Sequence, residues 1–145
     1  MSRATGLEGI RVVELGEGVS AAYASKLMGD LGADVVKIEP PGGDRARLRG
    51  PFPRGVPDPE QSGLFLYLNT NKRGIRLDPA SERAAFERLV ARTDILVHNV
   101  PAAQMARHGL VYDELRRLNP RLVLCSITPF GLSGPYRDYR AHDLN

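Results

Sequence analysis

The sequence predicts an α/β protein with a Rossmann-like layout, in which helices cover both faces of a mostly parallel sheet. Two observations favour this fold class. Short runs rich in β-branched residues alternate along the chain with segments whose apolar residues recur at helical spacing. The strand-like runs are almost continuously apolar, which is typical of strands buried on both faces of a parallel sheet. With 145 residues, the chain has room for one domain with its own core.

The first predicted unit is a strand, a helix and a second strand. RVVEL at 11–15 and DVVKIE at 34–39 are the strands. Between them, four apolar residues share one helical face: Ala24, Leu27, Met28 and Leu31. Gly32 stands where it can end that helix. We expect the two strands to be parallel, with a right-handed crossover.

A Gly- and Pro-rich stretch, PPGGDRARLRGPFPRG at 40–55, follows this unit. It carries four arginines: Arg45, Arg47, Arg49 and Arg54. We expect a flexible cationic loop that could meet phosphates; the alternative is a solvated loop without such a role. Nucleic acid is not an expected partner, because no aromatic residues alternate with these arginines and the net charge is only +3.

Strands and helices alternate again in the second half of the chain. The expected strands are GIRLD at 74–78, DILVHNV at 94–100 and RLVLCSIT at 121–128, and the expected helices are 79–93, 101–109 and 112–120. Asp78 is the predicted N-cap of the first of these helices, with Pro79 at its first position. Lys72 and Arg73 precede the strand at 74–78, so we interpret them as structural residues at the sheet edge opposite a ligand.

The composition and the chain end give expectations about the cellular compartment and about whether the chain is a fragment. One cysteine, Cys125, has no partner and fits a small buried residue in a reducing compartment. No apolar run suits a membrane span or a secretion signal, so we expect a cytoplasmic protein without membrane association. No metal site is expected. Because HDLN reads as the start of a new element, we expect a C-terminally truncated fragment, although a complete domain with a frayed end is the alternative.

A glycine turn follows the first strand. Residues 16–21, GEGVSA, fit the dinucleotide fingerprint G-x-G-x-x-G/A, and Glu39 stands where a ribose-binding carboxylate would. Glu17 weakens this reading because its charge would lie near the phosphates, and Pro40 and Pro41 stiffen the segment after Glu39. A tight strand-to-helix turn also needs glycine whatever it binds. The turn therefore predicts either an NAD site, as in an oxidoreductase domain, or a site for another ligand.

Five blocks in order carry a family resemblance: LEGIRVVELG, LMGDLGADVVKIEPPGGDRAR, LNTNKRGIRLD, RTDILVHNVPAAQMARHGL and LNPRLVLCSITPFGLSGPYRDY. Together they resemble the N-terminal part of the class III CoA-transferase family, which includes formyl-CoA and carnitine CoA-transferases and α-methylacyl-CoA racemases. The resemblance implies a Rossmann-like CoA-binding domain at 1–127, with 128–145 leading into a missing remainder. It also implies acyl-CoA and a carboxylic acid as substrates, and an intertwined homodimer in the full-length protein.

The resemblance also implies a set of CoA contacts at matching positions: Gly18, Leu77, Asn99, Val100, Arg107, His108 and Arg140. Arg47 is a further candidate for a phosphate-binding fork. Each arginine has the alternative of a surface residue that packs its stem over apolar neighbours. Asn99 could instead cap the helix that opens with Pro101, and His98 is expected to fill a strand position. Two positions where relatives carry cations are Pro40 and Ala80 here.

The resemblance places the reaction itself elsewhere. Transferases of the family work through a carboxylate that attacks the acyl thioester, and the matching aspartate is expected beyond residue 145. His142 is the one catalytic candidate, because racemases carry a histidine in a similar context and its pKa suits proton transfer. A CoA-transferase fragment that is inactive alone is thus the main hypothesis. The alternatives are a racemase that uses His142, an NAD-dependent oxidoreductase domain and a non-catalytic CoA-binding module.

Overall fold

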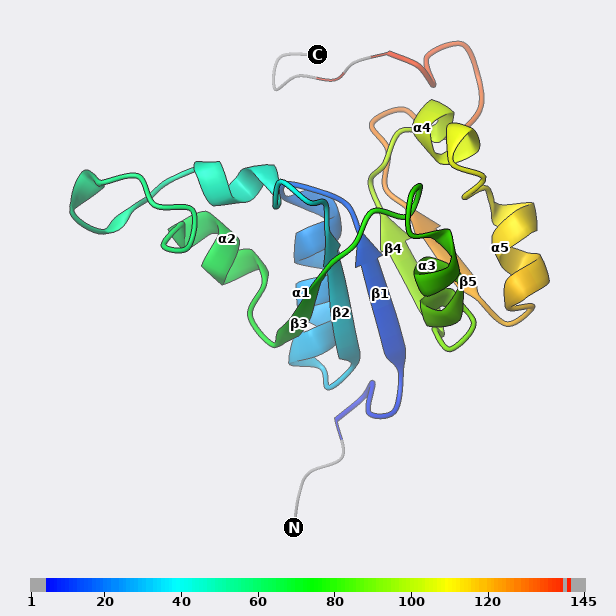
Figure 1. Cartoon of the computed structure of the whole chain (residues 1–145), viewed down its shortest axis with the longest axis horizontal. Helices are drawn as coiled ribbons and strands as arrows, with labels where there is room; N and C mark the ends of the chain where they lie inside the picture. The colour runs from blue at the N-terminus through cyan, green and yellow to red at the C-terminus, as the bar shows by residue number, and fades with distance from the viewer. Residues whose placement is uncertain (1–4, 140, 142–145) are drawn as a thin grey trace.

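Figure 1 shows the computed structural model of the chain, which describes residues 5–139 and 141. Its five strands form one parallel sheet in the order β3-β2-β1-β4-β5. The strands are β1 (Arg11–Leu15), β2 (Asp34–Glu39), β3 (Lys72–Arg76), β4 (Ile95–His98) and β5 (Val123–Ser126). The α-helices are α1 (Ser20–Asp30), α2 (Gly63–Leu68), α3 (Arg83–Val90), α4 (Ala102–Arg107) and α5 (Tyr112–Leu118). The predicted α/β fold class is confirmed.

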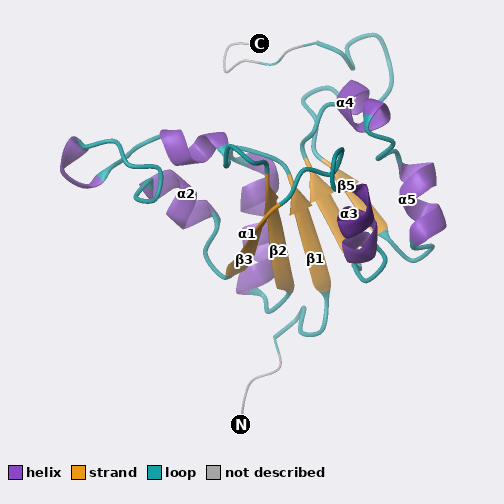
Figure 2. Cartoon of the chain, viewed as in Figure 1, coloured by secondary structure: helices purple, strands orange, loops and turns teal. Residues whose placement is uncertain are grey.

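Helices cover both faces of the sheet, as predicted (Figure 2). Val12 and Val13 point to opposite faces, because successive residues of a strand alternate. Val12 belongs to the smaller apolar cluster, which α1 covers, and Val13 belongs to the larger one, which α3 and α5 cover. Phe86, Val90 and Leu115 are almost completely buried in the larger cluster. The sheet is therefore the middle layer of three.

The first βαβ unit forms with the predicted elements, but the predicted apolar face of its helix is wrong: Leu27 and Leu31 are exposed, and α1 instead buries Ala21, Ala22 and Ser25 against the sheet. β1 and β2 have the expected bounds and pair in register from Arg11 opposite Asp34 to Leu15 opposite Ile38. Gly32 ends α1 with a φ of +96°, which a residue with a side chain rarely adopts. The order of the strands reverses direction between β1 and β4, so the connections leave a crevice at the carboxyl ends of these two strands.

The prediction for α3 is wrong at its start. The helix begins at Arg83, not at Pro79, because Glu82 has a non-helical backbone (φ −110°, ψ 39°). Asp78 caps a turn instead: its carboxylate accepts hydrogen bonds from Ala80 N–H (3.0 Å) and Ser81 Oγ–H (2.7 Å). β3 also begins two residues earlier than expected, so Lys72 and Arg73 are its first residues.

The expectation of a flexible arginine loop is wrong for residues 45–48, which form a 3-10 helix. Asp44 caps it by accepting a hydrogen bond from Ala46 N–H (2.8 Å), and Ala46 is buried. The short α2 follows, which the sequence did not predict. Ser62 caps α2 and ties it back, because its hydroxyl donates to the Ala46 carbonyl (2.8 Å).

Among the described residues, no helix combines the length and the apolar character that a bilayer crossing requires. After β5, the described part of 127–139 forms neither helix nor strand. This segment runs away from the sheet past α4 (Figure 1).

Candidate functional site

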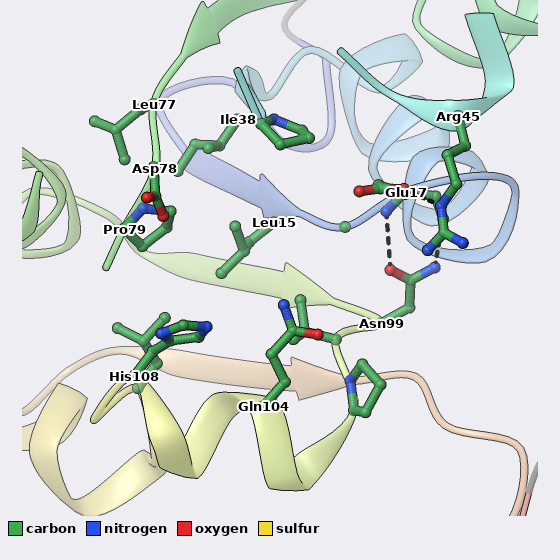
Figure 3. A pocket seen from close by; sticks show the side chains of 15 residues that line it. Leu15, Glu17, Ile38, Arg45, Leu77, Asp78, Pro79, Asn99, Gln104 and His108 are labelled. Atoms are coloured by element: carbon green, nitrogen blue, oxygen red, sulfur yellow. Dashed lines mark hydrogen bonds and ion pairs between the residues drawn. The ribbon is translucent and has the colours of Figure 1, made fainter. Parts of the chain in front are cut away.

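A cavity of about 300 Å³ opens at the carboxyl end of the sheet (Figure 3). The ends of β1, β2, β3 and β4 and the helix α4 supply its walls. Its lining residues are Leu15, Gly16, Glu17, Ile38, Pro40, Arg45, Leu77, Asp78, Pro79, Asn99, Val100, Pro101, Gln104, His108 and Leu110. Open parallel sheets bind ligands at this place, outside the strand ends where the topology reverses. The fold therefore marks this cavity as the candidate site.

The cavity has an apolar base and a polar mouth. Leu15, Ile38 and Leu77 come from three neighbouring strand ends, and their side chains point into the cavity (Figure 3). Gln104 on α4 and His108 in the turn after α4 face these side chains. An apolar trench with a few convergent polar groups suits a ligand that has a flat or extended apolar part and polar edges.

Asn99 joins β4 to the glycine turn after β1. Its Oδ1 accepts a hydrogen bond from Glu17 N–H (3.1 Å), and its Nδ2 donates to the Glu17 carbonyl (2.7 Å) (Figure 3). The Nδ2 also donates to Ser20 Oγ (3.0 Å). Gly16 is required beside it, because a Cβ there would lie 2.2 Å from Asn99 Oδ1. The alternative that Asn99 caps α4 is wrong, since that helix has no side-chain cap.

Asp44 holds the other side of the glycine turn. Its Oδ1 accepts a hydrogen bond from Gly18 N–H (3.0 Å), at a residue with a φ of +75°. Its Oδ2 pairs with Lys37 Nζ (2.7 Å). The side chain of Asp44 is completely buried. The turn is therefore fixed from two directions, by Asn99 on β4 and by Asp44 before the 3-10 helix.

A cluster of four buried charges lies beneath this turn and consists of Glu14, Lys37, Asp44 and Lys72. Glu14 accepts from Lys37 Nζ (2.6 Å) and Lys72 Nζ (2.7 Å). It also accepts from Ser25 Oγ–H (2.6 Å). Alternating charges keep every member of the cluster paired, which buried ions require. We call these four residues the buried charge cluster.

The two lysines of the buried charge cluster respond differently to burial. Burial disfavours the charged form of Lys37, but Glu14 and Asp44 outweigh it, and the pKa of Lys37 is raised above its ordinary value. Burial dominates at Lys72, whose pKa is lowered although Glu14 opposes the shift. Lys72 reaches Glu14 from the start of β3, which supports the structural interpretation of this residue.

Arg47 is engaged away from the cavity. Its guanidinium grips both carboxylate oxygens of Glu39, at 2.7 and 2.8 Å, and lies 3.7 Å from the centre of the Phe65 ring. It also reaches Glu60 at 3.2 Å. The hydrogen bonds from Arg47 lower the pKa of Glu39. The carboxylate that a ribose would need is thus already paired within the chain.

The structure brings together half of the expected CoA contacts. Leu77, Asn99, Val100 and His108 all line the cavity. Gly18 lies beside it in a smaller hollow of about 200 Å³, next to Arg45 and Arg49. Neither Arg47 nor the exposed Arg107 is among the lining residues. Arg140 and His142 lie outside the described residues.

Four polar lining residues were not among the CoA contacts that the family resemblance implied: Glu17, Arg45, Asp78 and Gln104. Arg45 forms an ion pair with Glu17 at the mouth. A hydrogen bond from Ser81 lowers the pKa of Asp78, so this carboxylate adds a negative charge to the wall. The signal was available for Asp78, which directly follows Leu77 at the carboxyl end of a strand.

His98 fills a strand position, as expected. It is 2% exposed, and its Nε2 lies 2.6 Å from Ser126 Oγ on the adjacent β5. Burial lowers the pKa of His98. Cys125 is half-buried and packs against the cluster under α1. Among the described residues, no three His, Cys, Asp or Glu side chains form a group that could hold a metal ion.

Comparison with known proteins shows what the chain resembles in sequence. It is 41% identical over 142 residues to a succinate–glutarate CoA-transferase from Agrobacterium fabrum, covering 94% of this chain and 36% of that protein. It is also 41% identical over 142 residues to a formyl-CoA:oxalate CoA-transferase from Streptomyces avermitilis, covering 95% of this chain and 33% of that protein. The chain thus spans about a third of the length of these curated relatives.

Solved structures share the fold. A CAIB/BAIF family protein from Brucella suis is 36% identical with a TM-score of 0.87, over 98% of this chain and 38% of that one. The protein Rv3272 from Mycobacterium tuberculosis is 32% identical with a TM-score of 0.83, over 97% and 39% of the two chains. The family model described as CoA-transferase family III matches residues 7–145. Since that match takes in the whole sheet and every wall of the cavity, the chain belongs to CoA-transferase family III.

Proposed function

We propose that this chain is the N-terminal, CoA-binding part of an enzyme that moves CoA between an acyl-CoA and a carboxylic acid. One observation carries the proposal: four of the positions that the family resemblance assigns to CoA meet around one cavity at the carboxyl rim of the sheet. These four residues are Leu77, Asn99, Val100 and His108. They follow two strands, β3 and β4, and the helix α4, so the fold and not proximity in sequence assembles them.

The cavity offers CoA an apolar wall and separate polar positions. Leu77, Val100 and Leu110 can pack against the adenine or the pantetheine arm. Among the described residues, Arg45 lines the cavity at its mouth, the ring of His108 lines it as well, and the exposed Arg107 lies next to His108 on the chain. The Asp78 carboxylate disfavours a phosphate on its side of the cavity. This arrangement supports an orientation with the apolar parts inside and the phosphates at the rim.

The transfer step requires a carboxylate that we place outside this chain, as the family resemblance implies. An aspartate oxygen attacks the thioester carbon, the C–S bond breaks, and the CoA thiolate leaves while an acyl-aspartyl anhydride forms. The thiolate then attacks the aspartyl carbonyl, which breaks the anhydride C–O bond and releases the donor carboxylate. The acceptor carboxylate attacks the resulting aspartyl-CoA thioester and releases the thiolate, which attacks the acceptor carbonyl of the new anhydride, forms the product acyl-CoA and frees the aspartate. The role of this chain is to hold the nucleotide end of CoA so that the thioester reaches the aspartate.

The alternatives have less support. The racemase reaction depends on His142, which lies outside the described residues, and the relatives described above are named as CoA-transferases. An NAD-dependent oxidoreductase needs the glycine turn, whose Glu17 and Gly18 amides are already paired. A non-catalytic CoA-binding module differs from the proposal only by the missing aspartate.

We also propose that the full-length protein is a cytoplasmic homodimer. Large apolar side chains of α1 and α2 lie 44–57% exposed, and they are Tyr23, Leu27, Leu66 and Tyr67. α1 and α2 are in contact, and Lys26 Nζ on α1 lies 5.3 Å from the centre of the Tyr67 ring on α2. Burial of such a surface against a second subunit would remove it from water. Sedimentation of the 145-residue chain tests this: we expect self-association, and a stable monomer at high concentration would contradict it.

A thermal-shift titration tests the proposed ligand. A ligand that binds only the folded state raises the melting temperature with its concentration. We expect CoA to stabilise the chain and NAD to leave the melting temperature unchanged. Stabilisation by NAD without an effect of CoA would overturn the proposal.

A further inference from the structure

We infer that Asp44 is a specificity-determining residue that closes the glycine turn after β1 to the pyrophosphate of a dinucleotide. The turn has the sequence of a dinucleotide fingerprint, yet its own chain fills the places that the pyrophosphate and ribose would take. The inference concerns the turn beside the cavity, and it rests on the proposed function only where it names CoA as the favoured ligand.

The backbone donors of the turn are already used. In a dinucleotide site the second glycine lets the backbone approach the pyrophosphate. Here that glycine is Gly18, and its N–H donates to Asp44 Oδ1 at 3.0 Å. The neighbouring Glu17 N–H donates to Asn99 Oδ1 at 3.1 Å. A phosphate at this position would have to displace a carboxylate and an amide oxygen.

Asp44 cannot easily move aside, because its position is fixed by several bonds. Its Oδ2 pairs with Lys37 Nζ at 2.7 Å, and Oδ1 also accepts from Ala46 N–H at 2.8 Å. Its own N–H donates to Glu39 Oε2 at 3.0 Å. Removing one partner from a buried ion pair is costly, since the other charge stays uncompensated. The carboxylate is therefore a permanent part of the turn.

The ribose position is closed in the same way. The acidic residue that ends the second strand of a dinucleotide site binds the ribose hydroxyls. Here this residue is Glu39, and Arg47 grips both of its carboxylate oxygens, at 2.7 and 2.8 Å. The bond from Asp44 N–H to Glu39 links the two closed positions. The groups that would hold a dinucleotide are thus bonded to other residues of the same chain. The cavity can then take only a ligand whose phosphates bind elsewhere, and the phosphates of CoA would bind at the mouth.

Amide hydrogen exchange of the wild-type protein tests the closure without any ligand. Gly18 belongs to no helix or strand, so an unbonded amide there would exchange as in an open loop. We expect exchange at Gly18 to be slowed at least about 100-fold relative to an unstructured peptide. Exchange at the rate of an unstructured peptide would overturn the inference.

Two variants then separate the carboxylate from its hydrogen bond. Asp44→Asn keeps an oxygen for Gly18 N–H and should retain slow exchange there, whereas Asp44→Ala should accelerate it at least about tenfold. Asp113→Asn, an exposed aspartate on α5, is the matched control and should match the wild type. If Asp44→Ala fails to fold, the wild type and Asp44→Asn still decide. Equal exchange at Gly18 in folded Asp44→Ala and wild type would contradict the role of Asp44.

Titration with inorganic pyrophosphate and with NAD tests specificity. In the wild type we expect neither to shift the NMR signal of the Gly18 amide at millimolar concentration. In Asp44→Ala the free amide and the lost negative charge should raise the affinity for pyrophosphate at least about tenfold. A wild-type Gly18 signal that moves with NAD would overturn the inference. Failure of CoA to bind the wild type would instead refute the proposed function and leave this result standing.

Discussion

Asn99 and Glu17 are joined by a pair of reciprocal hydrogen bonds, from Glu17 N–H to Asn99 Oδ1 (3.1 Å) and from Asn99 Nδ2 to the Glu17 carbonyl (2.7 Å). The pair connects the carboxyl ends of β1 and β4, between which the strand order of the sheet reverses. Both residues line the cavity. The Asn99 side chain bonds both the N–H and the carbonyl of Glu17, as a neighbouring strand would. This wall of the site therefore depends on the Asn99 amide.

Gly16→Ala should displace Asn99. The new methyl group would lie 2.2 Å from Asn99 Oδ1 and 3.1 Å from the Ala21 Cβ. We expect destabilisation of about 1–3 kcal/mol, measured by urea unfolding, because the asparagine must leave its partners on Glu17. The double variant Gly16→Ala with Asn99→Ala should be close in stability to Asn99→Ala alone. Additive losses would show that Asn99 is not what the methyl group meets.

Glu14→Gln should destabilise the fold strongly. Of the carboxylates in the described part of the chain, Glu14 alone bonds both lysines of the buried charge cluster, Lys37 and Lys72. Its neutral replacement leaves buried positive charge without full compensation, at a cost of about 3–5 kcal/mol. Glu8→Gln, at an exposed glutamate, is the control and should unfold like the wild type. An exposed ion pair contributes less than about 1 kcal/mol to the free energy of unfolding. A loss that small for Glu14→Gln would contradict the burial of the cluster.

The stability of the fold should fall as the pH drops below the ordinary pKa of histidine. Burial lowers the pKa of His98 in the folded state, so the unfolded chain binds a proton first. The contribution of neutral His98 to the free energy of unfolding is complete above pH 6.5, the ordinary pKa of histidine. It is lost as the pH falls through the lower pKa that His98 has in the folded state. We expect His98→Gln to flatten the decrease in melting temperature between about pH 6.5 and 5, a range chosen above the titration of the carboxylates. An unchanged pH dependence of the melting temperature in His98→Gln would contradict this account of the buried histidine.

Filling the cavity from α4 should block the ligand and spare the fold. Gln104 is exposed on α4 and lines the cavity, whereas Ala103 is exposed on the same helix and does not. We expect Gln104→Trp to weaken CoA binding at least about tenfold, since a bulky ring would occupy the space that the ligand needs. Ala103→Trp should bind CoA like the wild type. Calorimetric titration of both variants, with matched melting temperatures, gives the comparison.

The sequence predicted the elements whose signals are local. β1 and β2 have the predicted bounds, and Gly32 ends α1, because β-branched runs and a C-terminal glycine act within a few residues. The start of α3 was misplaced because an aspartate that caps a turn looks the same in sequence as one that caps a helix. Asp78 caps a turn, and α3 begins only at Arg83. The six residues of α2 are too few to show a helical period.

The long-range parts of the site were beyond local reasoning. Asp44 closes a turn 26 residues away, and Arg47 meets Glu39 after the chain has folded back on itself. One signal was present: Glu14 and Lys37 interrupt two apolar strands at the same position, and the parallel register sets them opposite each other. An opposite-charge pair at matching positions of two buried strands predicts a buried ion pair.

A map of bound CoA on the protein tests the central claim most directly. Titration of the isotope-labelled chain with CoA, followed by NMR, reports which amides the ligand affects. We predict the largest shifts at Leu77, Asn99, Val100 and His108, around the cavity at the carboxyl rim of the sheet. Shifts confined to the opposite edge of the sheet, or centred on Gly16 and Gly18 with NAD in place of CoA, would contradict the account.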